Sequence, residues 1–439
     1  MPETVQSGTF RRNVKWQFVG SASQALLSGL LLLLMGRELG ARGFGVFSIV
    51  MGFVYVANLL LEPRIQDVAA KLFWDLNRDD ATRSHHSQCF IDLFVIEALG
   101  KLLPCIALVL LAPLLADVGN LYSGANLLIM IAAIGTYLSK LGYGLSVGLL
   151  RVLGRSDLYA YCATSELVLR LLLTLALIWF AELTILGCVV VLCISGIVSN
   201  TVQWLLVVKQ FEGIGASLRE WKPAAAIGRL RENRRLLLSN LGLSASDLMN
   251  KDLDITLIAP LMSPDQVGMY KMAKNITLLS WRAIDPFYLA LMPEVNRLVA
   301  MSNFAGVKRL LTKSSIGLLG LAVGLSLVTY VLLVLFGDVV LGVAYSKVPK
   351  LMPWMLVGIV ASAPLVWGHP LAVALNRADI AFTGSLLGSV IGFFAFLLLT
   401  PAYGTYGAGV AWTLTFLLNF TFTAVVSLRL LQRHVLVGQ

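Results

Sequence analysis

Twelve apolar runs, each long enough to cross a bilayer, occupy most of this chain of 439 residues. A helix needs about 20 apolar residues to span a hydrocarbon core of about 30 Å. The runs cover residues 17–36, 44–63, 89–115, 120–142, 157–181, 184–208, 235–260, 266–291, 314–336, 351–374, 379–400 and 406–430. The segments between them are too short to fold as soluble domains, so we expect an all-α integral membrane protein with about 12 transmembrane helices.

The composition and the placement of charge agree with a membrane protein. Hydrophobic residues make up 58% of the chain and the mean hydropathy is +0.81, whereas soluble domains are about 45–50% apolar. The net charge of +10 does not indicate a nucleic-acid partner, because the basic residues alternate between loops. Of 34 Lys and Arg residues, only Arg37, Arg42, Lys347 and Lys350 fall in odd-numbered loops. Basic residues concentrate in cytoplasmic loops, so we expect both termini in the cytoplasm.

The sequence contains no specific motif for a bound metal or nucleotide, since the DxD of Asp252 and Asp254 is a weak signal inside an apolar helix. The five cysteines show neither CxxC spacing nor a pairing with histidine, and they are most simply small apolar packing residues. Gly100 and Lys101 are followed by Leu102, so they do not form a phosphate-binding loop. We therefore expect no metal, no cofactor and no ATPase activity.

The two halves of the chain resemble each other at a nearly constant offset. Residues 45–47, 122–123 and 154–158 recur as residues 268–270, 345–346 and 376–380, at offsets of 222 or 223. Six predicted spans separate the copies, so the repeats are parallel, an arrangement that many transporters use. We expect two six-helix lobes around a central cavity. They are residues 1–209 and residues 235–439, joined by a basic cytoplasmic linker at residues 210–234.

Ionisable residues at bilayer depth are costly, so they mark interior surfaces of a membrane protein. In this chain they recur at the spacing of three and four residues that places side chains on one helix face. The sets are Asn240, Ser244, Asp247, Lys251 and Asp254 in the seventh span, Lys271, Lys274, Arg282 and Asp285 in the eighth, Glu97 and Lys101 in the third, and Glu166 and Arg170 in the fifth.

The pairs Glu97–Lys101 and Asp247–Lys251 have the spacing of helical ion pairs, and such pairs can simply neutralise each other inside a lobe. Lys271, Lys274 and Arg282 have fewer acids on their own face, and together with Lys251 and Arg170 they are the candidates for binding an anionic substrate. Arg and Lys both bind phosphate oxygens. The candidates for sensing a coupling ion are Glu166, Asp247 and Asp254.

The sequence contains an RxLGxxxFGxF motif made of Arg37, Leu39, Gly40, Gly43, Phe44, Gly45 and Phe47. This motif resembles the hairpin of the polysaccharide transport branch of the MATE/MOP flippase superfamily. Asp252, Ile258, Asp265, Gly268, Tyr270 and Ala273 resemble its seventh and eighth spans, and Leu399, Pro401, Tyr403, Gly404, Gly407, Ala408 and Gly409 resemble the start of its last helix. The resemblance covers almost the whole chain. It departs at Glu62, Pro63 and Arg64, where relatives carry a small Asp/Gly turn.

The resemblance implies a Wzx-like flippase rather than an enzyme. Such proteins turn polyprenyl-pyrophosphate-linked oligosaccharides from the cytoplasmic to the outer leaflet of a bacterial or archaeal cytoplasmic membrane, for lipopolysaccharide (O-antigen) or exopolysaccharide synthesis. The resemblance also implies alternating access by two lobes. It implies membrane lipids as surroundings, and polysaccharide polymerase or assembly proteins as partners.

Two alternatives remain open from the sequence. An ion-coupled multidrug or cation exporter of the MATE type would share the length, the spans and the repeat, and the intramembrane charges of both signs do not separate it from a flippase. Loss of drug resistance or loss of surface glycan on deletion would distinguish the two. A membrane polymerase or glycosyltransferase generally needs a large outer loop with catalytic acids, and the odd-numbered loops are short.

Overall fold

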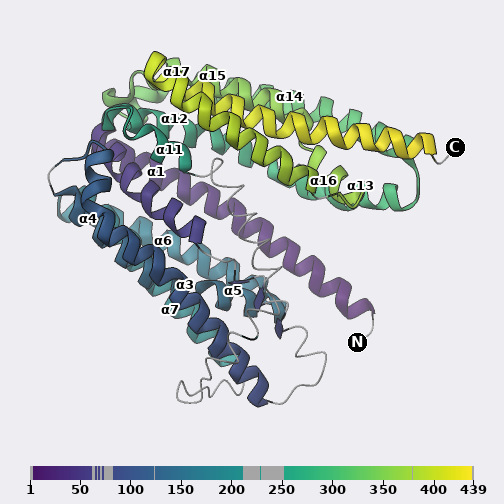
Figure 1. Ribbon diagram of the computed structural model, residues 1–439, viewed down its shortest axis with the longest axis horizontal. Coiled ribbons are helices and arrows are strands. Elements are labelled where there is room, and N and C mark those ends of the chain that lie inside the picture. The colour runs from purple at the N-terminus through teal and green to yellow at the C-terminus, as the bar shows by residue number, and fades with distance from the viewer. Residues whose placement is uncertain are drawn as a thin grey trace. The chain divides into compact units, whose positions relative to one another are not determined.

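The computed structural model describes residues 3–61, 65–66, 68–69, 72–73, 83–122, 124–210, 228, 252–377 and 379–437. These residues are almost entirely helical and contain no strand (Figure 1). Among them, eight helices are long and apolar enough to cross a membrane. Large apolar side chains point outward along them, including Leu110, Phe180 and Leu398, which are 74%, 89% and 72% exposed. Such surfaces suit lipid rather than water, and the predicted all-α membrane fold is confirmed.

The longest helices each contain two of the predicted spans. Helix α1 (Glu3–Leu61) is interrupted at Gly40, where φ is 64°, and α17 (Asp379–Val437) is interrupted at Gly404, where φ is 58°. Both values lie in the left-handed region, which glycine adopts without a steric penalty. The two interruptions fall in the first and eleventh loops of the sequence prediction.

Contacts divide the chain into two compact units, residues 1–31 with 50–245 and residues 32–49 with 246–439. Residues 32–49, which contain the hairpin motif, therefore pack within the second unit. The predicted linker at residues 210–234 lies almost wholly outside the described residues. The division into lobes at residues 1–209 and 235–439 stays a prediction.

The first unit is built from α3 (Arg83–Val118), α4 (Ala125–Lys140), α5 (Tyr143–Val152), α6 (Ser156–Phe180) and α7 (Ile185–Gln210). Helix α4 packs against α3 and α7, and α6 packs against α7. Leu93, Leu145, Leu149 and Val207 form part of a buried core around α5, and Trp204 packs against it in a T-shaped contact with Phe90. All five cysteines are buried as free thiols, in agreement with their interpretation as packing residues.

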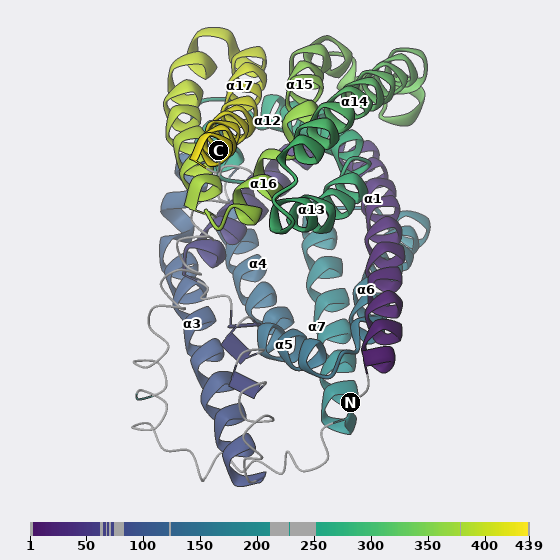
Figure 2. The same ribbon diagram turned by 90° about the vertical axis from the view of Figure 1, so that its right-hand side faces the viewer.

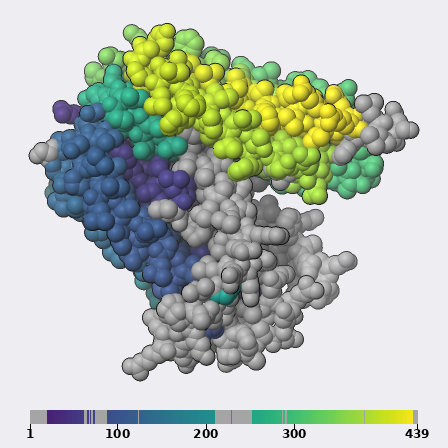
Figure 3. Space-filling model, in the orientation of Figure 1, coloured from purple at the N-terminus to yellow at the C-terminus, as the bar shows by residue number. Residues whose placement is uncertain are grey.

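The second unit contains α11 (Leu253–Ile258), α12 (Pro264–Arg282), α13 (Asp285–Ala300), α14 (Phe304–Val340), α15 (Val348–Ser362), α16 (Gly368–Ala374) and α17, with short 3₁₀ turns at Val343–Tyr345 and Ala363–Leu365. Helix α15 packs against α12, α14 and α17 (Figure 2). Aromatic rings join α12 to α17, since Trp281 meets Phe416 edge-on with centroids 4.7 Å apart. Side chains of α17 form much of the face of this unit that Figure 3 shows.

The internal repeat is visible in the bounds of the helices. Helices α3 and α14 end at Val118 and Val340, and α4 and α15 begin at Ala125 and Val348. In both copies the next span is interrupted and then resumes, as α5 in the first copy and α16 in the second. The fourth span therefore continues to Val152, beyond its predicted end at residue 142. The matching interruptions show that the duplication predicted from short motifs extends to the backbone.

The turn after each interrupted span is also duplicated. It begins with a residue of positive φ, Gly154 in the first copy and Asn376 in the second, and both glycine and asparagine tolerate that conformation. An arginine and an aspartate follow, and they pair with each other: the Arg155–Asp157 distance is 3.1 Å and the Arg377–Asp379 distance is 2.9 Å. In each pair the aspartate lies in the first turn of the following helix.

The segment around the Gly40 kink packs very closely on the start of α12. A Cβ atom added at Gly45 would lie 1.8 Å from the carbonyl oxygen of Pro264, and one added at Gly268 would lie 1.9 Å from the carbonyl oxygen of Ala41. Gly45 and Gly268 are equivalent positions of the repeat, and so are residues 41 and 264. The two copies of one motif therefore contact each other symmetrically, and only glycine fits at the crossing.

Candidate functional site

A cluster of charged residues joins α11 to α12. Lys274 donates to both carboxylate oxygens of Asp254, at 2.8 and 2.7 Å, and the hydroxyl of Tyr270 donates to the same carboxylate at 2.6 Å. The side chains of Lys274 and Asp254 are 1% and 0% exposed. A buried charge is tolerated when it is paired and its hydrogen-bonding capacity is used, and here a cation and a hydroxyl together satisfy the carboxylate.

Local sequence sets the geometry of this cluster. Helix α12 starts with Pro264, and Ser263 and Gln266 form a capping box that satisfies its first backbone N–H groups. Tyr270 and Lys274 are four residues apart, so they lie on one face. Helix α11 begins immediately after Asp252, so Asp254 lies in its first turn, where its carboxylate meets Tyr270 and Lys274.

A second, more accessible pair lies beside the buried one. Lys271 is paired with Asp252, and their side chains are 17% and 21% exposed. Arg282, in the last turn of α12, has an exposed side chain and no ion pair with any described residue. Lys251 and Asp247 lie outside the described residues, as do Asn240 and Ser244.

The first unit contributes a comparable pair on α6. Arg170 and Glu166 are 2.5 Å apart, and each side chain is 20% exposed. The Nε of Arg170 also donates to the hydroxyl of Ser195 on α7, at 3.1 Å. These two residues, predicted to lie on one helix face, thus form an ion pair whose side chains are both partly exposed.

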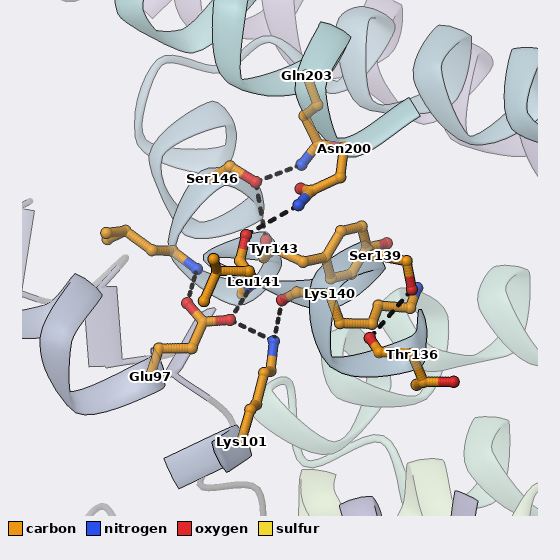
Figure 4. A network of polar contacts seen from close by, with 12 residues as sticks. Glu97, Lys101, Thr136, Ser139, Lys140, Leu141, Tyr143, Ser146, Asn200 and Gln203 are labelled. Atoms are coloured by element: carbon orange, nitrogen blue, oxygen red, sulfur yellow. Dashed lines mark hydrogen bonds and ion pairs between the residues drawn. The ribbon is translucent and has the colours of Figure 1, made fainter. Parts of the chain in front are cut away.

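An ion pair on the neighbouring helix α3 bonds to both sides of the interruption in the fourth span, between α4 and α5 (Figure 4). Glu97 accepts hydrogen bonds from the backbone N–H groups of Gly144 and Leu145, at 2.7 and 2.9 Å, at the start of α5. Lys101 donates to the carbonyl oxygen of Lys140 at 2.6 Å, at the end of α4, and to Glu97 at 2.5 Å. The carboxylate meets the positive end of one helix and the ammonium meets the negative end of the other, so each charge satisfies backbone groups that the interruption exposes.

Polar residues of α7, which were not among the residues predicted from the sequence, complete this network. Asn200 donates to the carbonyl oxygen of Leu141 at 2.8 Å, and Gln203 donates to the hydroxyl of Ser146 at 2.6 Å. Both are buried. The signal that could have identified them is an amide side chain within an otherwise apolar span, since such a side chain needs a partner inside the membrane.

The equivalent interruption in the second unit uses neutral groups. The hydroxyl of Ser315 donates to the carbonyl oxygen of Pro364 at 2.8 Å, and the indole N–H of Trp367 donates to Ser315 at 2.8 Å. The two copies therefore share a backbone interruption but satisfy it with different chemistry.

Comparison with known proteins agrees with this architecture. The family described as "Polysaccharide biosynthesis protein" matches residues 10–299, more than half of the chain. The chain belongs to the polysaccharide biosynthesis protein family. The motifs on which the sequence analysis based its resemblance thus indicated the correct family. No curated protein sequence gives a significant match.

Solved structures show which fold this polysaccharide biosynthesis protein shares. An inward-facing multidrug resistance MATE family transporter of the MOP superfamily is 14% identical, covers 93% of this chain and 95% of its own, and gives a TM-score of 0.69. The lipid II flippase MurJ in an inward closed conformation is 11% identical, with 97% and 93% coverage and a TM-score of 0.68. A MATE transporter of Vibrio cholerae is 17% identical, with 98% and 99% coverage and a TM-score of 0.57.

The chain therefore belongs to a polysaccharide biosynthesis family and has the fold that a MATE transporter and the flippase MurJ share. At these identities the structural likeness concerns the fold alone. The roles predicted for the charged residues stay predictions.

Proposed function

We propose that this protein is a flippase for a polyprenyl-pyrophosphate-linked oligosaccharide in surface polysaccharide synthesis. It turns the carrier from the cytoplasmic to the outer leaflet of a bacterial or archaeal cytoplasmic membrane by alternating access, with both termini in the cytoplasm. The family match over residues 10–299 carries this proposal. Membrane lipids and the proteins that polymerise or assemble the glycan are its expected partners.

The physical need for such a protein lies in the headgroup. A pyrophosphate and its sugars cannot cross hydrocarbon unaided, because their charge and hydroxyl groups lose hydration there. Cations at bilayer depth lower that barrier by pairing with the pyrophosphate, while the polyprenyl tail stays in lipid. The membrane potential supplies about 2.3 kcal/mol per elementary charge per 100 mV, and an ion gradient can supply more.

Arg170 and Lys271 are the candidates whose geometry suits pyrophosphate best. Each is paired with a carboxylate, but the side chain of Arg170 is still 20% exposed and that of Lys271 is 17% exposed. An arriving anion can therefore replace the acid as the partner of either cation. Arg282 and Lys251 complete the proposed set. Lys274 is buried against Asp254, and we assign it the role of holding α11 and α12 together.

The first prediction concerns these two cations. Deleting the gene is expected to abolish surface glycan and to accumulate polyprenyl-pyrophosphate oligosaccharide, measured by mass spectrometry of lipid extracts, and the wild-type gene restores both. The variant Arg170→Gln with Lys271→Gln is expected to restore less than a tenth of the glycan at normal protein level. Both pairs are partly exposed, so loss of their cations should cost less stability than loss of the cation of the buried Lys274–Asp254 pair, and the protein level is measured in the same cells.

The matched control is Lys308→Gln with Arg309→Gln, which removes the same charge from exposed positions near the start of α14. It should restore glycan fully. Full restoration by the Arg170 and Lys271 variant would refute the proposed role of these residues. Normal glycan after deletion, together with increased drug susceptibility, would favour a MATE-type exporter instead.

A second prediction concerns ion coupling. Among the acids proposed to sense a coupling ion, Glu166 is partly exposed whereas Asp254 is fully buried in its ion pair. Replacement Glu166→Gln is expected to reduce the response of transport to an imposed pH or sodium gradient at least tenfold, measured as headgroup translocation in proteoliposomes. A wild-type protein whose transport ignores both gradients would remove this role from Glu166, Asp247 and Asp254 alike.

A further inference from the structure

A pocket of about 350 Å³ lies in the second unit, where three turns of the chain meet. It is formed by residues 39–42 at the Gly40 kink, by Asp265 and Met269 of α12, and by residues 344, 346 and 347 before α15. These are the first, seventh and ninth loops of the sequence prediction with their adjoining helix ends, all expected on the same face of the membrane. The volume falls within the range of about 300–1,000 Å³ that small-molecule sites occupy.

The pocket gathers the basic residues that break the charge pattern of the chain. Arg42 and Lys347 line it, and Lys350 follows one turn later on α15. Arg37 precedes the pocket residues and donates to the carbonyl oxygen of Val339, at 3.2 Å. These four are the Lys and Arg residues in odd-numbered loops. A basic residue in an outer loop opposes the orientation that the other basic residues specify, so their concentration around one pocket indicates a specific task.

Arg42 and Lys347 also lie at helix starts, where a positive charge is electrostatically unfavourable. Lys347 is the N-cap of α15, and the first turn of that helix contains no acid. Arg42 lies at the start of the helical segment that follows the Gly40 kink. The N-terminal end of a helix carries partial positive charge, which repels cations and attracts anions. Arg42 and Lys347 are exposed and have no ion pair among the described residues. An anion bound between them would pair with both side chains close to two helix starts.

We propose that this pocket binds a phosphate or pyrophosphate group on the predicted outer face of the protein. Arg42 supplies a planar fork for phosphate oxygens, Lys347 supplies a compact charge, and the hydroxyl of Ser346 supplies a hydrogen-bond donor. Asp265 also lines the pocket and opposes the anion, so it limits the affinity. A site that must release its ligand benefits from such a limit.

Two sources of this chemistry exist at an outer membrane surface. One is the headgroup of an anionic phospholipid of the outer leaflet, and the other is a pyrophosphate such as that of a translocated carrier. The binding site is independent of which glycan the protein moves. It is also distinct from the proposed set of Arg170, Lys251, Lys271 and Arg282.

The test uses a thiol placed at the pocket itself. The full-length protein with Ala344→Cys, an exposed lining position with no assigned ligand role, is labelled with a membrane-impermeant maleimide, against a parent whose five cysteines are all buried. Labelling of intact cells is expected for the variant and not for the parent, which places the pocket outside. In phosphatidylcholine nanodiscs, inorganic pyrophosphate is expected to slow labelling at least tenfold. Nanodiscs that contain phosphatidylglycerol and no pyrophosphate report whether a lipid headgroup fills the same site.

Substitutions then identify the groups responsible. Adding Arg42→Gln with Lys347→Gln should abolish protection, whereas Lys308→Gln with Arg309→Gln should leave it within twofold of the starting value. Asp265→Asn should give half-maximal protection at a several-fold lower pyrophosphate concentration. Labelling that neither pyrophosphate nor phosphatidylglycerol slows, or protection that survives the loss of both cations, overturns the proposal. Because no transport is measured, failure of the proposed flippase function leaves these outcomes unchanged.

Discussion

Replacing Lys274 by methionine is expected to destabilise the second unit by about 3–5 kcal/mol, because it leaves the carboxylate of Asp254 buried without a cation. The two side chains are 1% and 0% exposed, so water cannot take the place of the lost partner. Asp254→Leu should cost a similar amount for the opposite reason, since it strands the ammonium group. The purified protein is unfolded in detergent by heat or denaturant, and its stability is measured. The amount of folded protein in the membrane is a second readout.

Three further variants make this expectation specific. Asp254→Leu with Lys274→Met removes both charges and should recover most of the lost stability, because apolar replacement of a whole buried pair is often neutral. Tyr270→Phe removes one hydrogen bond to Asp254 and should cost about 1 kcal/mol. Arg377→Gln breaks an exposed pair and should change stability by less than about 1 kcal/mol. Additive losses in the Asp254 and Lys274 double variant would show that the two residues are not energetically coupled.

Gly268→Ala should also be severely destabilising, by about 3 kcal/mol, at the upper end of the range for overpacking. The new methyl carbon would lie 1.9 Å from the carbonyl oxygen of Ala41, and that oxygen belongs to the backbone. A flexible side chain could rotate away, but here a helix must move. Gly45→Ala meets the same obstacle at Pro264. Thermal unfolding and the yield of folded protein measure the effect.

Glycines of α14 provide the matched control. A methyl group added at Gly317, Gly320 or Gly324 meets nothing within 4 Å. In these positions Gly→Ala should be neutral or stabilising by about 0.5–1 kcal/mol, because glycine is the weaker helix former. If Gly268→Ala and Gly320→Ala behaved alike, the close crossing would not exist in the folded protein.

Apolar length and internal repetition made most of the fold predictable from the sequence. Runs of about 20 apolar residues have few solutions in a bilayer other than helices, and short equivalent motifs at offsets of 222 or 223 revealed the duplication. The pairs Glu97–Lys101 and Glu166–Arg170 were also predictable, because both members lie on one helix at a spacing of four residues. Helical geometry alone brings such residues together.

The partners of Lys271 and Lys274 were not predictable in the same way. Their acids, Asp252 and Asp254, precede Lys271 and Lys274 by 19 and 20 residues and lie at the start of another helix, α11. Counting acids on the face of the same helix therefore made these lysines look unpaired. The capping role of Glu97 was hidden for a related reason, since it depends on an interruption of the fourth span that the apolar run does not reveal.

The symmetric crossing of residues 41–45 with residues 264–268 bears on the origin of the chain. In this contact, residue 41 meets residue 268 and residue 264 meets residue 45, so equivalent positions exchange equivalent contacts. A twofold homodimer makes contacts of this kind. A half-length ancestor that dimerised through this glycine would have kept its interface when its gene was duplicated and fused. The interrupted spans could then diverge, one keeping charged groups and the other neutral ones, while the glycines at the shared axis could not change.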